Sequence, residues 1–273
     1  MQWSKLKNIM LLILLATNLF LLFLLGQRNW SSQRYEASAR TDALAILSKN
    51  GIVMQEETLP HDITLLSATV SRDREREAEL LAPLLGGTVF EESLGGSQYF
   101  YSGEKGQAYF RGRGEFDLLL IPGAYTLDGS MEQHAAATLA LMGFDAVPAG
   151  VSGTPEDGTV TLIQLWQNTP VLSCTVQVSY TDGCLTSVSG TRLSGTPSPG
   201  TSHSLSSVTG LLRFLELFTQ SGDVCNRINV MQGGYRLITG PSGPSTLVPV
   251  WYFATDTGAY LLDMSENQLR KVT

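Results

Sequence analysis

The longest apolar run of the chain lies near its N-terminus and predicts a membrane-spanning helix. Residues Ile9 to Leu25 read IMLLILLATNLFLLFLL, without a charged side chain. At helical rise, a run of about 17 residues approaches the hydrocarbon thickness of a bilayer. Lys5 and Lys7 precede the run, where long basic side chains reach the headgroup layer, and Trp3 falls at interfacial depth. We therefore expect residues 1–28 to form a short tip and a transmembrane anchor.

A cleaved signal peptide is the alternative reading of the same run. Such a peptide needs a small-residue cleavage site directly after the apolar segment. The first candidate, Ala37-Ser38-Ala39, comes only after several charged residues, which favours an uncleaved anchor. Charge counting does not orient this anchor, because basic residues flank the run on both sides.

Two residues interrupt the apolar composition of the predicted anchor. Thr17 and Asn18 are the only side chains of the run with hydrogen-bonding groups. An asparagine at mid-bilayer has no water to bind, and such residues bond across helix pairs for about 0.6 to 2 kcal/mol. Asn18 therefore marks a predicted partner-binding face, with a polar residue tolerated in a lone anchor as the equal alternative. The leucines that share this face are Leu11, Leu14, Leu15, Leu21, Leu22 and Leu25.

After the anchor, apolar positions follow helical and strand periods in turn. Residues 30–49 predict a helix that ends at Asn50-Gly51. Residues 63–71 predict a strand, and residues 73–85 a helix with a leucine stripe. The charged run from Arg72 to Glu79 is interpreted as the solvated face of that helix.

The rest of the chain alternates between strands and two further helices. Ser130 and Gln133 have the spacing of a capping box and predict a helix that runs to Met142. Apolar residues at helical spacing predict another helix from Leu205 to Phe218. Residues 148–158 are interpreted as a boundary, and residues 194–204, rich in Ser, Thr, Gly and Pro, as a loop. Predicted strands cover residues 98–101, 107–111, 116–121, 159–167, 171–180, 185–192, 228–238, 246–255 and 259–263.

These elements predict an α+β fold. A single N-terminal transmembrane helix precedes an outer region of two similar mixed α/β subdomains with antiparallel sheets, over residues 29–150 and 151–273. A weak internal repeat supports two related halves: a glycine turn separates Phe100-Tyr101 from Ala108-Tyr109, and another separates Tyr252-Phe253 from Ala259-Tyr260.

Composition narrows the class of partner. The chain has 273 residues, 43% hydrophobic and 16% charged, enough to bury one large core or two smaller ones. A formal net charge of -7 gives phosphate backbones little attraction, so nucleic acid is not expected as a partner. The three cysteines are too few and too scattered for a disulfide framework or a metal site, and a turn at Asp182-Gly183 keeps Cys174 and Cys184 apart.

No pattern in the sequence is typical of an active site. The three histidines share no metal-binding or catalytic spacing, and nucleophile-elbow, P-loop and dinucleotide motifs are absent. Glu91-Glu92 and Asp256 could serve a wall-cleaving hydrolase only if the fold brought their carboxylates together. We therefore expect no catalysis, no cofactor and no metal.

Four short segments form a recognisable set. They are Trp3-Ser4-Lys5-Leu6-Lys7, Leu165-Trp166-Gln167-Asn168 leading to Pro170-Val171, Thr181-Asp182-Gly183 and Val250-Trp251-Tyr252-Phe253. With the apolar helix, this set resembles the YycI regulatory proteins of Gram-positive bacteria, relatives of YycH. The resemblance covers nearly the whole chain, and the loop before Leu205 and the cysteines depart from it.

The resemblance implies a single-pass cell-membrane protein with a cytoplasmic N-terminus and an extracytoplasmic α+β domain. It implies association with a YycH-like protein and with the sensor histidine kinase of the Wal (Yyc) two-component system, which controls cell-wall metabolism. On this reading the chain is a non-catalytic regulator that acts on the kinase through its transmembrane helix and outer domain. A membrane-tethered cell-wall hydrolase and an extracytoplasmic peptide- or glycan-binding protein are the alternatives. Carboxylates gathered in a cleft would favour the first, and a deep apolar pocket the second.

Overall fold

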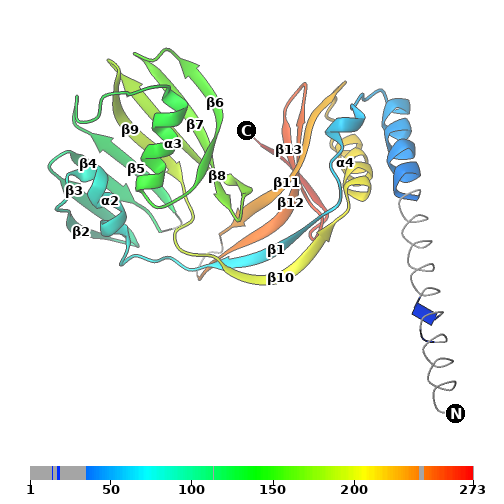
Figure 1. The fold of residues 1–273 in the computed structure, drawn as a ribbon, viewed down its shortest axis with the longest axis horizontal. Helices are drawn as coiled ribbons and strands as arrows, with labels where there is room; N and C mark the ends of the chain where they lie inside the picture. Colours follow the sequence, from blue (N-terminus) through cyan, green and yellow to red (C-terminus); the bar gives the residue numbers. More distant parts are fainter. Residues whose placement is uncertain (1–13, 15–16, 19–34, 113, 240–242, 273) are drawn as a thin grey trace, which may run out of the picture.

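The fold combines a few helices with a large, mostly antiparallel sheet (Figure 1). The computed structural model describes residues 14, 17–18, 35–112, 114–239 and 243–272. Hydrogen bonds connect 14 strands, which confirms the prediction of an α+β fold with antiparallel sheets. Within these described residues, we find no helix that combines the length and the apolar character needed to span a bilayer. The predicted anchor lies largely outside them.

A helix followed by a four-stranded antiparallel meander recurs three times in the described chain. The first unit consists of α2 (Glu77–Leu85), β2 (Phe90–Gly95), β3 (Gln98–Gly103), β4 (Gly106–Phe110) and β5 (Glu115–Leu120). The second consists of α3 (Met131–Leu141), β6 (Ala146–Gly153), β7 (Gly158–Trp166), β8 (Thr169–Thr181) and β9 (Cys184–Thr191). The third consists of α4 (Ser207–Ser221), β11 (Ile228–Ile238), β12 (Ser245–Thr255), β13 (Ala259–Asp263) and β14 (Gln268–Val272). The two similar hairpins of the sequence, β3–β4 and β12–β13, are the second and third strands of two such units.

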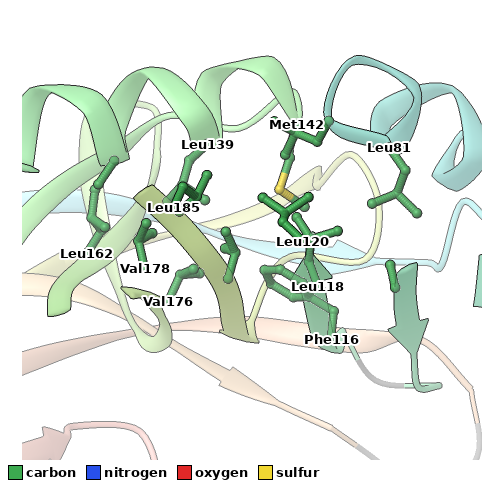
Figure 2. Packing of buried hydrophobic residues seen from close by; sticks show 14 of the residues in the cluster. Leu81, Phe116, Leu118, Leu120, Leu139, Met142, Leu162, Val176, Val178 and Leu185 are labelled. Carbon is green, nitrogen blue, oxygen red and sulfur yellow. The ribbon is translucent and has the colours of Figure 1, made fainter. Parts of the chain in front are cut away.

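The first two units share one sheet. Their last strands, β5 and β9, pair antiparallel, which gives the strand order β2-β3-β4-β5-β9-β8-β7-β6. Helices α2 and α3 cover the same face of this sheet. Figure 2 shows Leu81 of α2, Leu139 of α3 and Met142 directly after α3 packed over sheet residues that include Phe116 and Val176. Each fully buried side chain of this kind contributes roughly 1.5 to 3 kcal/mol.

The other elements surround the third unit. Strands β1 (Ile63–Val70) and β10 (Ser198–Leu205) pair antiparallel, and β1 also pairs with β12. We call residues 77–191, from the start of α2 to the end of β9, the inserted part. The terminal part comprises the helix over residues 35–49, η1 (Glu56–Thr58), β1, β10 and the third unit. A parallel bridge between Tyr235 of β11 and Val171 of β8 joins the two sheets.

The core of the terminal part is aromatic. Phe214 of α4 stacks on Phe253 of β12 with ring centroids 4.2 Å apart, and Tyr260 meets Phe214 edge-on at 5.9 Å. Trp251 is fully buried next to α4, where a Cβ at Gly210 would stand 2.6 Å from the indole ring. The lack of a side chain at Gly210 therefore allows the helix to approach the sheet closely.

Several local signals in the sequence are confirmed. The Ser130 hydroxyl caps α3 by accepting a hydrogen bond from Gln133 N–H at 3.3 Å, and Gly222 ends α4 with a φ of 78°. Asp182 and Gly183, both with positive φ, form the predicted two-residue turn between β8 and β9.

Two segments that were predicted to be irregular are strands. The expected loop over residues 194–204 contains most of β10, which pairs along β1 despite its many small residues. The expected boundary over residues 148–158 contains most of β6, an edge strand in which Pro148 lies beside a bulge. Edge strands and bulges tolerate proline, because its missing N–H is not needed there. The predicted boundary between the two subdomains, at residue 150, thus lies within β6. Strands before and after this residue belong to the same sheet of the inserted part.

Candidate functional site

Two chain segments cross between the terminal part and the inserted part. Residues 71–76 lead from β1 to α2, and residues 192–197 return from β9 to β10. Asp73 N–H donates a hydrogen bond to Ser194 O at 2.8 Å. Gly195 lies so close to the Ser71 carbonyl that a side chain on it would overlap that oxygen. The two crossing segments therefore run in direct contact.

One buried carboxylate ties both crossing segments to the inserted part. Glu77, the first residue of α2, is 1% exposed. Arg72 donates from Nε and Nη2 to its two carboxylate oxygens, each at 2.8 Å. From the returning segment, Arg192 places Nη2 3.5 Å from Glu77 Oε1, and the Tyr101 hydroxyl donates to Oε2 at 2.9 Å. These four residues form the Glu77 cluster, whose contacts replace the water that the carboxylate loses on burial.

Burial and charge oppose each other within the Glu77 cluster. Burial lowers the pKa of Arg192 below its ordinary value, although Glu77 acts in the other direction. Burial also acts on Arg72, but its hydrogen bonds to Glu77 outweigh the loss of water and raise its pKa. Burial and the neighbouring Glu77 charge raise the pKa of Tyr101, so its hydroxyl stays protonated and donates. Two guanidinium groups thus share the Glu77 carboxylate. Arg72 binds both of its oxygens at 2.8 Å, whereas Arg192 reaches one of them at 3.5 Å.

A cavity of about 260 Å³ lies beside the Glu77 cluster. Its walls come from both crossing segments, the turn after α3 and the end of β7. Arg192 is the member of the Glu77 cluster that borders this cavity. The Trp166 ring lines another wall and packs on Tyr235 of the terminal part, with centroids 5.0 Å apart. The cavity therefore lies between the two crossing segments and the inserted part, next to the contact of Trp166 with Tyr235.

The helix over residues 35–49 packs firmly on the rest of the terminal part. Ala43 and Leu47 are 2% and 1% exposed and belong to the same core cluster as α4. Arg40 donates from Nη1 to Pro60 O at 2.6 Å and from Nη2 to Leu59 O. Figure 1 shows this helix, in blue, beside α4. A helix anchored in this way moves with the terminal part.

Few of the residues predicted on the membrane helix fall in the described chain. Leu14, Thr17 and Asn18 are helical and exposed. The others lie outside the described residues: Trp3, Lys5, Lys7, Leu11, Leu15, Leu21, Leu22 and Leu25. The partner-binding face around Asn18 stays a prediction.

The carboxylates considered for hydrolysis lie on different sheets. Glu91 and Glu92 are exposed on the edge strand β2. Asp256 lies in the turn between β12 and β13, where it accepts hydrogen bonds from Asn226 N–H at 3.0 Å and Arg227 N–H at 3.2 Å. Across the described positions, no three His, Cys, Asp or Glu side chains gather in a way that could hold a metal ion.

The histidines and cysteines have separate surroundings. His134 on α3 places Nδ1 2.9 Å from the Tyr180 hydroxyl, and His203 lies in β10. The three cysteines are free thiols, and burial raises the pKa of Cys174 to about 12 and that of Cys225 to about 11. These pKa values keep both thiols protonated and unreactive near neutral pH.

The interpretation of the charged run from Arg72 to Glu79 as a solvated face was wrong for Glu77, which is buried. Helix α2 begins at Glu77 and not at Asp73, so Arg72 belongs to the crossing segment. Glu77 points into the protein and meets Arg192, which is far away in the sequence. The sequence contains Arg72 and Arg192, but it does not show that both pair with Glu77. Only the folded structure brings these three residues together.

Comparisons with known proteins give distant matches. No protein-family model and no curated protein matches the chain. Among solved structures, an uncharacterized protein from Eubacterium rectale is similar with a TM-score of 0.47 and 9% identity, over 77% of this chain and 82% of that one. The C-terminal domain of Bacillus megaterium YpeB is similar with a TM-score of 0.36 and 12% identity, over 74% of this chain and 100% of that one. The resemblance to YycI is therefore not confirmed by these comparisons.

Proposed function

We propose that this chain is a single-pass membrane protein that regulates a membrane-bound sensor histidine kinase from outside the cytoplasm, without catalysis of its own. The proposal starts from the sequence: an uncharged run from Ile9 to Leu25 and segments that resemble the YycI proteins. It places the N-terminus in the cytoplasm and assigns a YycH-like protein as the second partner. Cell-wall metabolism is the process that such a kinase controls in the resembled family.

The observation that carries the proposal is the attachment of the helix over residues 35–49. Ala43 and Leu47 are buried against the terminal part, and Arg40 binds two carbonyl oxygens close to β1. A flexible tether would let the folded part move without affecting the anchor. A packed helix instead transmits rotation or tilt of the folded part toward the membrane. A ligand or partner that favours one position of the folded part would then shift the anchor, and with it the kinase helices that contact the anchor.

The described residues give less support to the hydrolase alternative. Glu91 and Glu92 lie on the inserted sheet, and Asp256 is engaged by backbone N–H groups in the terminal part. Glycosidic cleavage needs two carboxyl groups about 5 to 9.5 Å apart on either side of the bond. The binding-protein alternative has a specific feature in its favour, the cavity at the crossing of the two parts.

Topology and partners are tested together. A reporter active only outside the cytoplasm is fused after Thr273, and the tagged chain is purified from native membranes. We expect reporter activity, an intact N-terminus beginning at Met1, and co-purification of a sensor kinase with a YycH-like protein. A mature chain that begins near Arg40 would contradict the anchor, and purification without any sensor kinase would contradict the regulatory function.

A further inference from the structure

The cavity at the crossing carries charges of both signs. Arg192 and Arg76 supply two guanidinium groups, and Asp73 and Asp145 supply two carboxylates. Arg192 is buried, Asp73 is half-buried, and Arg76 and Asp145 are exposed. The charges come from three places in the chain: the outward segment with Asp73 and Arg76, the turn before β6 with Asp145, and the returning segment with Arg192. The lining of the cavity thus offers charges of both signs to a ligand.

Arg192 is the buried cationic group of the cavity, and it is paired less closely with Glu77 than Arg72 is. Arg72 takes both oxygens of Glu77 at 2.8 Å, whereas Arg192 reaches one of them at 3.5 Å. The Arg192 guanidinium also lies over the Phe110 ring, 4.7 Å from its centroid, which fixes its position. A positioned guanidinium with limited pairing attracts a carboxylate, which matches its planar fork.

The remaining walls restrict the size and character of a ligand. Gln164 is buried, and its Oε1 accepts a hydrogen bond from Leu193 N–H at 2.8 Å, which holds the returning segment in place. Leu80, Leu165 and the Trp166 ring supply apolar surface. A volume of about 260 Å³ accommodates a molecule the size of an amino acid or a dipeptide, and is small for a drug-sized ligand.

We propose that this cavity binds a small zwitterion, a free amino acid or an unblocked dipeptide. Its carboxylate pairs with Arg192 and Arg76, its ammonium group with Asp73 and Asp145, and its side chain lies against Trp166. An inorganic anion would face the two carboxylates without compensation, and a neutral sugar would supply no charge to pair with any of the four side chains. Because both crossing segments line the cavity, the ligand would contact both of them. The proposal does not depend on regulation of a kinase.

The test uses the full chain in detergent micelles with unlabelled probes. Free L- and D-amino acids and a set of unblocked dipeptides are screened by thermal unfolding, and each hit is titrated by calorimetry. We expect at least one probe to bind with one site per chain. Arg76→Gln and Asp145→Asn, changes at exposed positions, should each weaken binding at least tenfold, and the N-acetylated and amidated forms of the hit should not bind.

Matched controls separate this site from general charge effects. Arg270→Gln and Asp182→Asn change the same residue types at exposed positions away from the cavity, and should leave the affinity unchanged. Failure of every probe to bind would overturn the proposal. Binding that is unaffected by both Arg76→Gln and Asp145→Asn would place the ligand elsewhere and overturn it as well.

Discussion

The terminal part and the inserted part are stabilised by different contacts at their most critical points. In the terminal part, Phe214 of α4 packs on the rings of Phe253 and Tyr260 in the sheet, and the helix over residues 35–49 adds apolar side chains to that core. The inserted part has a core of aliphatic and aromatic residues under α2 and α3, and β8 packs on the terminal part through Val171 and Cys174. Glu77 and two arginines hold the crossing segments beside these apolar contacts. The comparison indicates that packing fixes the helix over residues 35–49 to the rest of the terminal part, whereas a buried ion cluster beside apolar contacts holds the crossing segments. Substitutions in the aromatic core should lower the stability of the whole fold. Substitutions in the Glu77 cluster should loosen the contact between the two crossing segments.

The largest expected effect comes from the aromatic core. Phe214→Ala removes a fully buried ring that contacts three others, and should lower the free energy of unfolding by about 4 kcal/mol. Urea unfolding followed by circular dichroism measures the change. Val224→Ala is the control, since Val224 is 79% exposed and should change stability by less than about 0.5 kcal/mol. A loss below about 1 kcal/mol for Phe214→Ala would contradict the role given to this core.

The Glu77 cluster should show the next largest effect. Glu77→Gln leaves two arginines without their shared carboxylate, and removal of one member of a buried ion pair costs about 3 kcal/mol. Hydrogen exchange should rise first at Asp73 N–H, which bonds across the crossing to Ser194. Glu79→Gln, an exposed change on the same helix, is the matched control. Equal behaviour of the two variants would show that the cluster does not hold the crossing.

A second buried carboxylate gives a pH-dependent prediction in the terminal part. Burial raises the pKa of Asp263, but hydrogen bonds from Ser265, Glu266 and Arg236 outweigh this and hold the pKa below its ordinary 3.8. Asp263→Asn should therefore cost about 2 kcal/mol at neutral pH. The ionised carboxylate stabilises the fold fully above pH 3.8, and this contribution is lost as the pH falls through the lower folded-state pKa. Denaturant unfolding at several pH values should show the two proteins converging in acid, and a constant difference down to the lowest pH would refute this.

The smallest expected effect lies in the predicted anchor. Asn18→Leu should preserve membrane insertion and the outer fold, and weaken association with the kinase or the YycH-like partner by about 1 kcal/mol. Membrane crosslinking measures the association, with Leu12→Ala as the control on another face of the same predicted helix. If Asn18→Leu crosslinks as well as the parent, the partners meet through the outer domain.

Local signals in the sequence predicted much of the fold, and long-range pairing accounts for what they missed. The Ser130 cap, the Gly222 stop and the Asp182-Gly183 turn are decided by neighbours in the chain, and all three are confirmed. Strand β10 could not be recognised from composition, because its partner β1 lies more than a hundred residues earlier. The same distance hid the contact between Glu77 and Arg192 and the cavity beside it.

The mechanical connection between the predicted membrane anchor and the helix over residues 35–49 is tested most directly by placing a flexible segment between them. A short flexible Gly-Ser insertion between Ser32 and Gln33 is compared with the same insertion after Gly123, an exposed turn residue of the inserted part. Transcription controlled by the sensor kinase is measured in cells that carry each variant. We expect the insertion after Gly123 to regulate like the parent, and the insertion after Ser32 to behave like a deletion of the gene while still co-purifying with the kinase. Normal regulation with the flexible insertion after Ser32 would contradict the proposal that the packed helix over residues 35–49 transmits the signal.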